Sequence, residues 1–123
     1  MRKWLRNLAA AGFAAALWAA AAGPAQAHAI ILAASPSAEQ RVAPGKLAIR
    51  IEFNSRIDKE RSRLQLIAPD GAKSDIAIEP AGDPNVISGT TGELAAGAYE
   101  LRWQVLAIDG HITRGDIPFS VGN

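Results

Sequence analysis

The stretch GAYELRWQV, from Gly97 to Val105, decides the fold class. Successive side chains on an extended chain point to opposite faces, so a period of two places one set of residues on each side. The apolar set here is Tyr99, Leu101, Trp103 and Val105, and the polar set is Glu100, Arg102 and Gln104. This pattern predicts a half-buried β-strand with Trp103 in the core.

Working outward from that strand, short extended segments recur between turn residues. Further strands are predicted at 29–34, 46–53, 63–68, 74–79 and 117–121. Pro44-Gly45 and Pro69-Asp70-Gly71 are typical of turns, and 80–92 is interpreted mostly as a loop because Gly, Pro, Asp and Asn are frequent there. Six or seven short strands in so few residues predict an all-β fold, an antiparallel β-sandwich of immunoglobulin-like type.

The first 27 residues have the pattern of an export signal. A basic opening precedes an apolar run from Leu8 to Ala22, and Ala25-Gln26-Ala27 has the A-x-A form that signal peptidases accept. The alternative is an uncleaved membrane anchor, but a spanning helix needs about 20 apolar residues and this run is shorter. We expect residues 1–27 to be removed and residues 28–123 to form one exported domain that begins with His28.

Composition narrows the function of the expected domain. Removal of residues 1–27 from the 123 leaves 96 residues, with 10 basic and 12 acidic side chains, so we expect no binding of nucleic acid. The chain has no cysteine, and its single methionine, Met1, leaves with the signal. A metal site in this domain must therefore use nitrogen and oxygen ligands.

The only two histidines each occupy a position with a chemical advantage. At a new N-terminus, the α-amine and the imidazole of His28 can chelate one metal ion together. Asp109 and His111 are two residues apart, with Gly110 between them, so their side chains can converge on one side of the chain. Three nitrogens and one carboxylate oxygen form a ligand set that suits copper(II) in tetragonal geometry.

Simpler interpretations of these residues stay open at this point. Asp-Gly is a common turn dipeptide, and an N-terminal histidine can arise by chance. Asp58, Glu60 and Asp70 are interleaved with basic residues and are interpreted as solvated surface. Asp116 is a candidate for supporting a ligand histidine from outside the coordination sphere.

The sequence resembles the CopC family of periplasmic copper-resistance proteins over the whole expected domain. The resemblance rests on His28-Ala29 with Ser35-Pro36, on 44–53, on Gly97 to Trp103, on Asp109-Gly110-His111, on Gly115 and on Phe119-Ser120-Val121. It implies a Greek-key β-sandwich that binds copper(II) through His28, Asp109 and His111. Two departures stand out: the methionine-rich loop of some members is missing, and Asn54 follows Phe53 where others carry a glutamate.

Three functions follow as expectations. The first is a monomeric periplasmic copper carrier or buffer with one copper(II) per chain and no enzymatic activity. For this carrier the resemblance adds delivery to a CopD-like inner-membrane protein. The second is a copper oxidase or monooxygenase built on a histidine brace like that of lytic polysaccharide monooxygenases. The third is a metal-free, immunoglobulin-like adhesion module.

Overall fold

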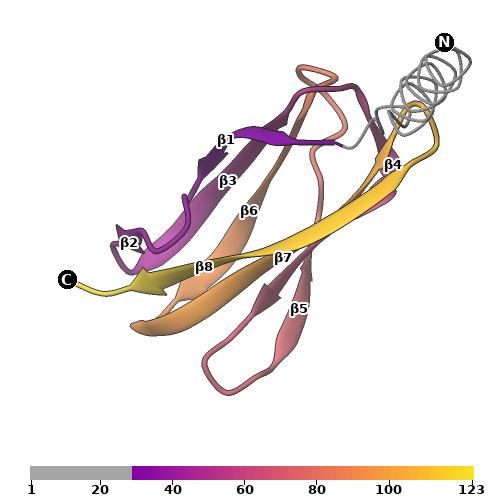
Figure 1. Ribbon diagram of the computed structural model, residues 1–123. Helices are drawn as coiled ribbons and strands as arrows, with labels where there is room; N and C mark the ends of the chain where they lie inside the picture. Colours follow the sequence, from indigo (N-terminus) through magenta and orange to yellow (C-terminus); the bar gives the residue numbers. More distant parts are fainter. Residues whose placement is uncertain (1–28) are drawn as a thin grey trace, which may run out of the picture.

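A computed structural model of the chain describes residues 29–123, and the regular structure in that range consists of β-strands (Figure 1). The predicted signal segment 1–27 and His28 lie outside the described residues. No helix in the described part is long and apolar enough to span a membrane. The strands, in chain order, are β1 (Ile31–Ser35), β2 (Arg41–Val42), β3 (Gly45–Phe53), β4 (Ile57–Ile67), β5 (Lys73–Ile76), β6 (Val86–Leu94), β7 (Gly97–Ala107) and β8 (Ile112–Val121).

The strands form two facing sheets (Figure 1). One has the order β1-β3-β6 and the other the order β2-β8-β7-β4-β5. All neighbours are antiparallel except β2 and β8, which pair in parallel over two residues. The chain changes sheet at every step from β1 to β4, and again between β5 and β6 and between β6 and β7. The predicted all-β Greek-key sandwich is confirmed.

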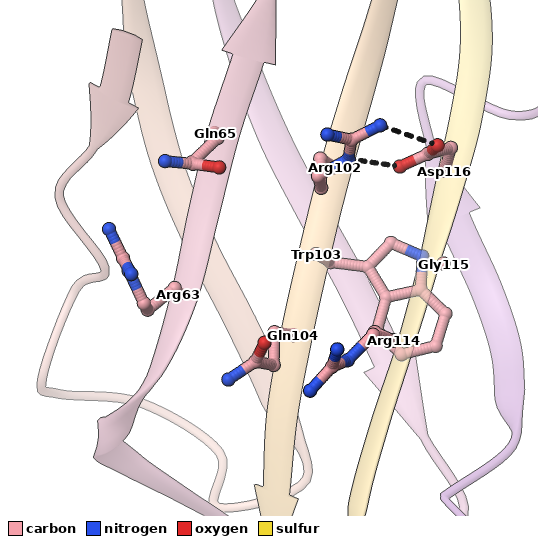
Figure 2. A pocket seen from close by; sticks show the side chains of 8 residues that line it. All are labelled: Arg63, Gln65, Arg102, Trp103, Gln104, Arg114, Gly115 and Asp116. Carbon is pink, nitrogen blue, oxygen red and sulfur yellow. Dashed lines mark hydrogen bonds and ion pairs between the residues drawn. The ribbon is translucent and has the colours of Figure 1, made fainter. Parts of the chain in front are cut away.

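The core lies between the sheets and is built largely by β3 and β7. Leu101 and Val105 are fully buried, and Trp103 is buried beside them, as the alternation in β7 predicts. The Trp103 ring meets Phe53 of β3 edge-on, with 5.4 Å between ring centroids. On its own sheet the indole lies against Gly115 of β8 (Figure 2), where a Cβ would come within 2.7 Å of the ring.

The second half of the stretch interpreted mostly as a loop, residues 86–92, is instead part of a strand, β6, whereas 80–85 contain no strand. β6 pairs with β3 over nearly its whole length, and Ile87 and Thr91 are buried in it. The sequence conceals this strand because Gly89 holds a position at which a side chain would be expected. A Cβ there would lie 2.6 Å from the Ala77 carbonyl oxygen, so close packing against that backbone accounts for the glycine.

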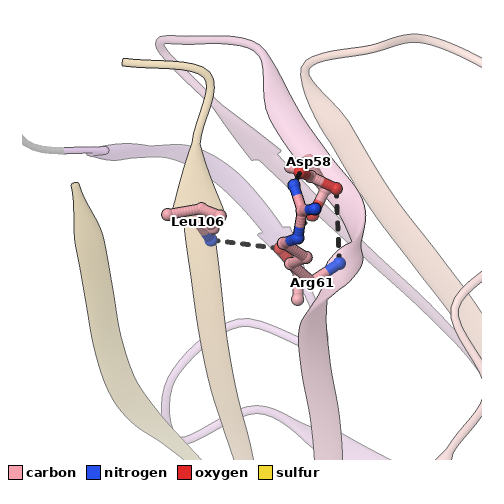
Figure 3. Close-up of polar contacts among 4 residues, drawn as sticks. Asp58, Arg61 and Leu106 are labelled. Carbon is pink, nitrogen blue, oxygen red and sulfur yellow. Dashed lines mark hydrogen bonds and ion pairs between the residues drawn. The ribbon is translucent and has the colours of Figure 1, made fainter. Parts of the chain in front are cut away.

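β4 contains a wide bulge near the end of the sandwich that carries the β7–β8 turn. Four residues of β4 lie between Asp58 and Arg63, whereas only one residue of β7 lies between their partners, Leu106 and Gln104. The Ser62 hydroxyl donates to the Asp58 carbonyl oxygen at 2.7 Å and accepts the Leu106 N–H at 3.1 Å (Figure 3). Arg61 closes the bulge from outside by donating to the Asp58 carboxylate. A side-chain hydroxyl thus replaces a missing ladder partner.

Candidate metal centre

The predicted Asp109-Gly110-His111 motif forms the tight turn between β7 and β8. The Gly110 N–H donates to the Ala107 carbonyl oxygen at 2.9 Å, and the Ala107 N–H donates to the His111 carbonyl oxygen at 2.9 Å. Gly110 has a φ of 94°, a conformation that side chains disfavour. The glycine expected to let the backbone bend therefore makes this turn possible.

The turn brings the two predicted ligand side chains together. His111 Nδ1 lies 3.2 Å from Asp109 Oδ2, and the His111 N–H donates to Asp109 Oδ1 at 3.2 Å. Both side chains are substantially exposed, 41% for Asp109 and 58% for His111. A histidine that ligates a metal through one ring nitrogen commonly donates its other N–H to a carboxylate. The pair therefore suits metal binding with Asp109 either as a ligand or as the group that orients the imidazole.

The negative charge of the Asp109 carboxylate favours the binding of a cation at the turn. Hydrogen bonds from the backbone N–H of His111 and then from its side chain lower the pKa of the Asp109 carboxyl below its ordinary value. Asp109 is consequently ionised at neutral pH and supplies a full negative charge at the turn.

The first described residues are fixed close to this turn. Ala29 is buried, and Ile30 exchanges two hydrogen bonds with Asn54, at 2.8 and 2.9 Å. Arg56 follows Asn54 by two residues, and its carbonyl oxygen accepts the N–H of Ile108, the residue just before the turn motif, at 3.0 Å. Two residues of extended chain span only about 7 Å. The start of the domain and the β7–β8 turn therefore share one end of the sandwich (Figure 1).

Of the three predicted ligand residues, the structure describes two. Asp109 and His111 come together, whereas His28 precedes the described residues by one position. Within residues 29–123 no group of three or more His, Cys, Asp or Glu side chains gathers to hold a metal. The described part alone offers two donors, a nitrogen and an oxygen, of the type that copper(II) accepts.

Two further residues have different roles from those the sequence indicates. The proposed support of a ligand histidine by Asp116 is wrong, because both carboxylate oxygens of Asp116 accept hydrogen bonds from Arg102, at 2.9 and 3.1 Å. Asn54, noted only as a departure from a glutamate, binds the backbone of Ile30. Sequence reasoning missed this anchor because its partner is a backbone group 24 residues away.

Comparison with known proteins gives one family. The family model described as CopC domain matches residues 31–122. The crystal structure of CopC from Methylosinus trichosporium OB3b is similar, with a TM-score of 0.71 and 28% identity over 76% of this chain and 93% of that one. PcoC, a methionine-rich copper-resistance protein from Escherichia coli, shares the fold, with a TM-score of 0.61 and 24% identity over 78% of this chain and 100% of that one. No curated protein matches the sequence.

Proposed function

The chain belongs to the CopC family, and from this premise we propose that it binds one copper(II) ion in the periplasm and acts as its carrier or buffer. Members of the family are periplasmic copper-resistance proteins that carry copper and are not enzymes. The histidine-brace oxidase is therefore not retained as an alternative.

The proposed ligands are the α-amine and imidazole of His28, exposed by cleavage after Ala27, together with His111 and Asp109. The observation that carries the proposal is the Asp109–His111 pair, held 3.2 Å apart at an exposed turn. The anchoring of Ile30 to Asn54 supports it, because residue 28 is only two positions upstream. Copper(II) is the cation that best suits three nitrogens and a carboxylate oxygen.

Delivery to a CopD-like membrane protein is part of the proposal and rests on the family. The surroundings of the turn support a docking partner, since Ile108 and Ile112, the residues that flank the motif, are 70% and 56% exposed. Ile30, bonded to Asn54, is 58% exposed. Large apolar side chains gathered at one end of a small domain are typical of a surface that another protein covers.

Copper(II) titration of three forms of the exported domain tests the proposal. The chain that begins with His28 is expected to bind one ion. The variants His111→Ala and His28→Ala are each expected to bind at least roughly tenfold more weakly, because each loses an imidazole nitrogen donor. Equal affinity of all three forms, or no uptake at all, would contradict the site, and the latter outcome would favour the metal-free adhesion module.

A further inference from the structure

The outer face of the five-stranded sheet carries a groove of about 380 Å³, whose lining includes no residue of the Asp109–His111 turn. Two rows of side chains cross it from β4 through β7 to β8, in the ladder register of those strands. We name it the Arg groove, and it is bordered by Arg63, Gln65, Arg102, Gln104, Arg114 and Asp116 (Figure 2). Its floor is the contact between Gly115 and the Trp103 ring.

The groove is cationic on a domain that is acidic as a whole. Residues 29–123 contain 10 Lys and Arg against 12 Asp and Glu, because three of the chain's 13 basic residues precede them. Within the groove three arginines face a single carboxylate, Asp116, with Asp75 at its border. Such a local excess of positive charge attracts anionic groups.

The three arginines differ in how far they are already engaged. Arg102 holds Asp116 through two parallel hydrogen bonds, the fork geometry in which guanidinium binds carboxylate most strongly. Arg63 approaches Asp75 only to 3.6 Å, with both side chains largely exposed. Arg114 is exposed and forms no ion pair with any residue of the described part. Arg63 and Arg114 are thus available to carboxylates from outside.

The spacing of these two arginines favours an extended peptide as the ligand. They stand on strands separated by β7, so their backbones are about 10 Å apart at the usual spacing of 4.7–4.9 Å between strands. Acidic residues two to four positions apart on an extended chain, at roughly 3.3 Å per residue, match this separation. Between the arginines, in the same row, the amide of Gln104 has donors and an acceptor that suit a peptide backbone.

We propose that the Arg groove binds an extended, acidic segment of a partner protein, whose carboxylates pair with Arg63 and Arg114. The proposal is independent of copper binding, since no residue of the groove belongs to the Asp109–His111 turn. It adds a second surface on which a partner can hold the domain while the metal end stays accessible.

A fluorescently labelled peptide of alternating Glu and Ser, titrated into the exported domain and followed by anisotropy, tests this inference. We expect saturable binding that weakens with added salt and is absent for the matched Gln-Ser peptide. The double variant Arg63→Gln/Arg114→Gln is expected to bind roughly tenfold or more weakly. The variant Lys46→Gln, which removes an exposed cation from the opposite sheet, is the matched control and should bind as the unaltered domain does.

Two further measurements separate peptide binding from copper binding and from binding to a membrane. His111→Ala is expected to bind the acidic peptide normally, which separates this inference from the copper site. Vesicles containing phosphatidylglycerol test an anionic membrane as the alternative ligand. Equal binding of the Glu and Gln peptides, unchanged binding by the double variant, or binding to vesicles without binding to peptide would each overturn the proposal.

Discussion

At the residue scale, Asp109 accepts hydrogen bonds from both the backbone and the ring of His111. A carboxylate in this position can bind copper(II) itself or fix the imidazole that does. Both roles depend on its negative charge, which the lowered pKa preserves at neutral pH.

The substitution Asp109→Asn removes that charge while keeping the shape and one acceptor oxygen. We expect the affinity for copper(II) to fall at least roughly tenfold, with an unchanged circular dichroism spectrum. Asp70→Asn, at an exposed turn where the Asp70 carboxylate accepts the Ala72 N–H, is the matched control. Retention of full affinity by Asp109→Asn would remove this carboxylate from the site.

Gly115 offers a second prediction at the residue scale. A Cβ at this position would lie 2.7 Å from the Trp103 ring, so Gly115→Ala must displace a buried indole. We expect the free energy of unfolding to drop by about 1–3 kcal/mol, as is usual for overpacking. Gly92→Ala is the control, because nothing lies within 4 Å of its added methyl. Equal denaturation midpoints for the two variants would show that the indole is not held against Gly115.

At the scale of the element, the bulge in β4 depends on one hydroxyl. Ser62 is buried and joins Asp58 to Leu106 through its Oγ. Ser62→Ala leaves a part-buried N–H without its acceptor, which typically costs about 1–3 kcal/mol. Urea denaturation is expected to show this loss, whereas the exposed Ser74→Ala should change stability little. A Ser62→Ala domain as stable as the unaltered one would mean that water replaces the hydroxyl.

Elements with regular alternation were predictable from sequence, and those with missing side chains were not. β3 and β7 follow the period of two throughout. β8 begins at Ile112, five positions before its predicted start, because Gly115 takes the inward position opposite Trp103 and interrupts the apolar pattern. β6 is concealed in the same way by Gly89. In each case contact with a distant residue, which local patterns do not report, decides the structure.

The same distinction between local and distant contacts applies to the candidate site. The meeting of Asp109 with His111 is a local property of a turn, and the sequence predicts it. The anchoring of Ile30 by Asn54 and the misassigned Asp116 depend on pairings across strands. Such pairings follow from the strand register, which the sequence leaves undetermined.

At the scale of the whole molecule, copper release and unfolding are expected in different pH ranges. Binding requires a deprotonated amine and deprotonated imidazoles, so protons compete with copper(II) and the affinity falls as the pH drops. The pKa values of Asp109 and Asp116 are lowered in the folded chain. Their stabilisation is therefore present above the unfolded value of about 4 and is lost only as the pH falls through the lower folded values.

The affinity for copper(II) should consequently weaken as the pH drops below neutral, while the domain is still folded. Parallel titrations check this expectation, with copper followed by a competing chelator and the fold by circular dichroism. Copper loss that coincides with unfolding would mean that the metal holds the sandwich together.

The central claim is that export processing creates the copper site by making His28 the first residue, beside the turn that carries Asp109 and His111. Native mass spectrometry of the protein recovered from the periplasm, with and without one equivalent of copper(II), tests it most directly. We predict a chain that starts at His28 and gains the mass of a single copper ion. A chain that starts at any other residue, or one that starts at His28 and takes up no copper, would contradict the account.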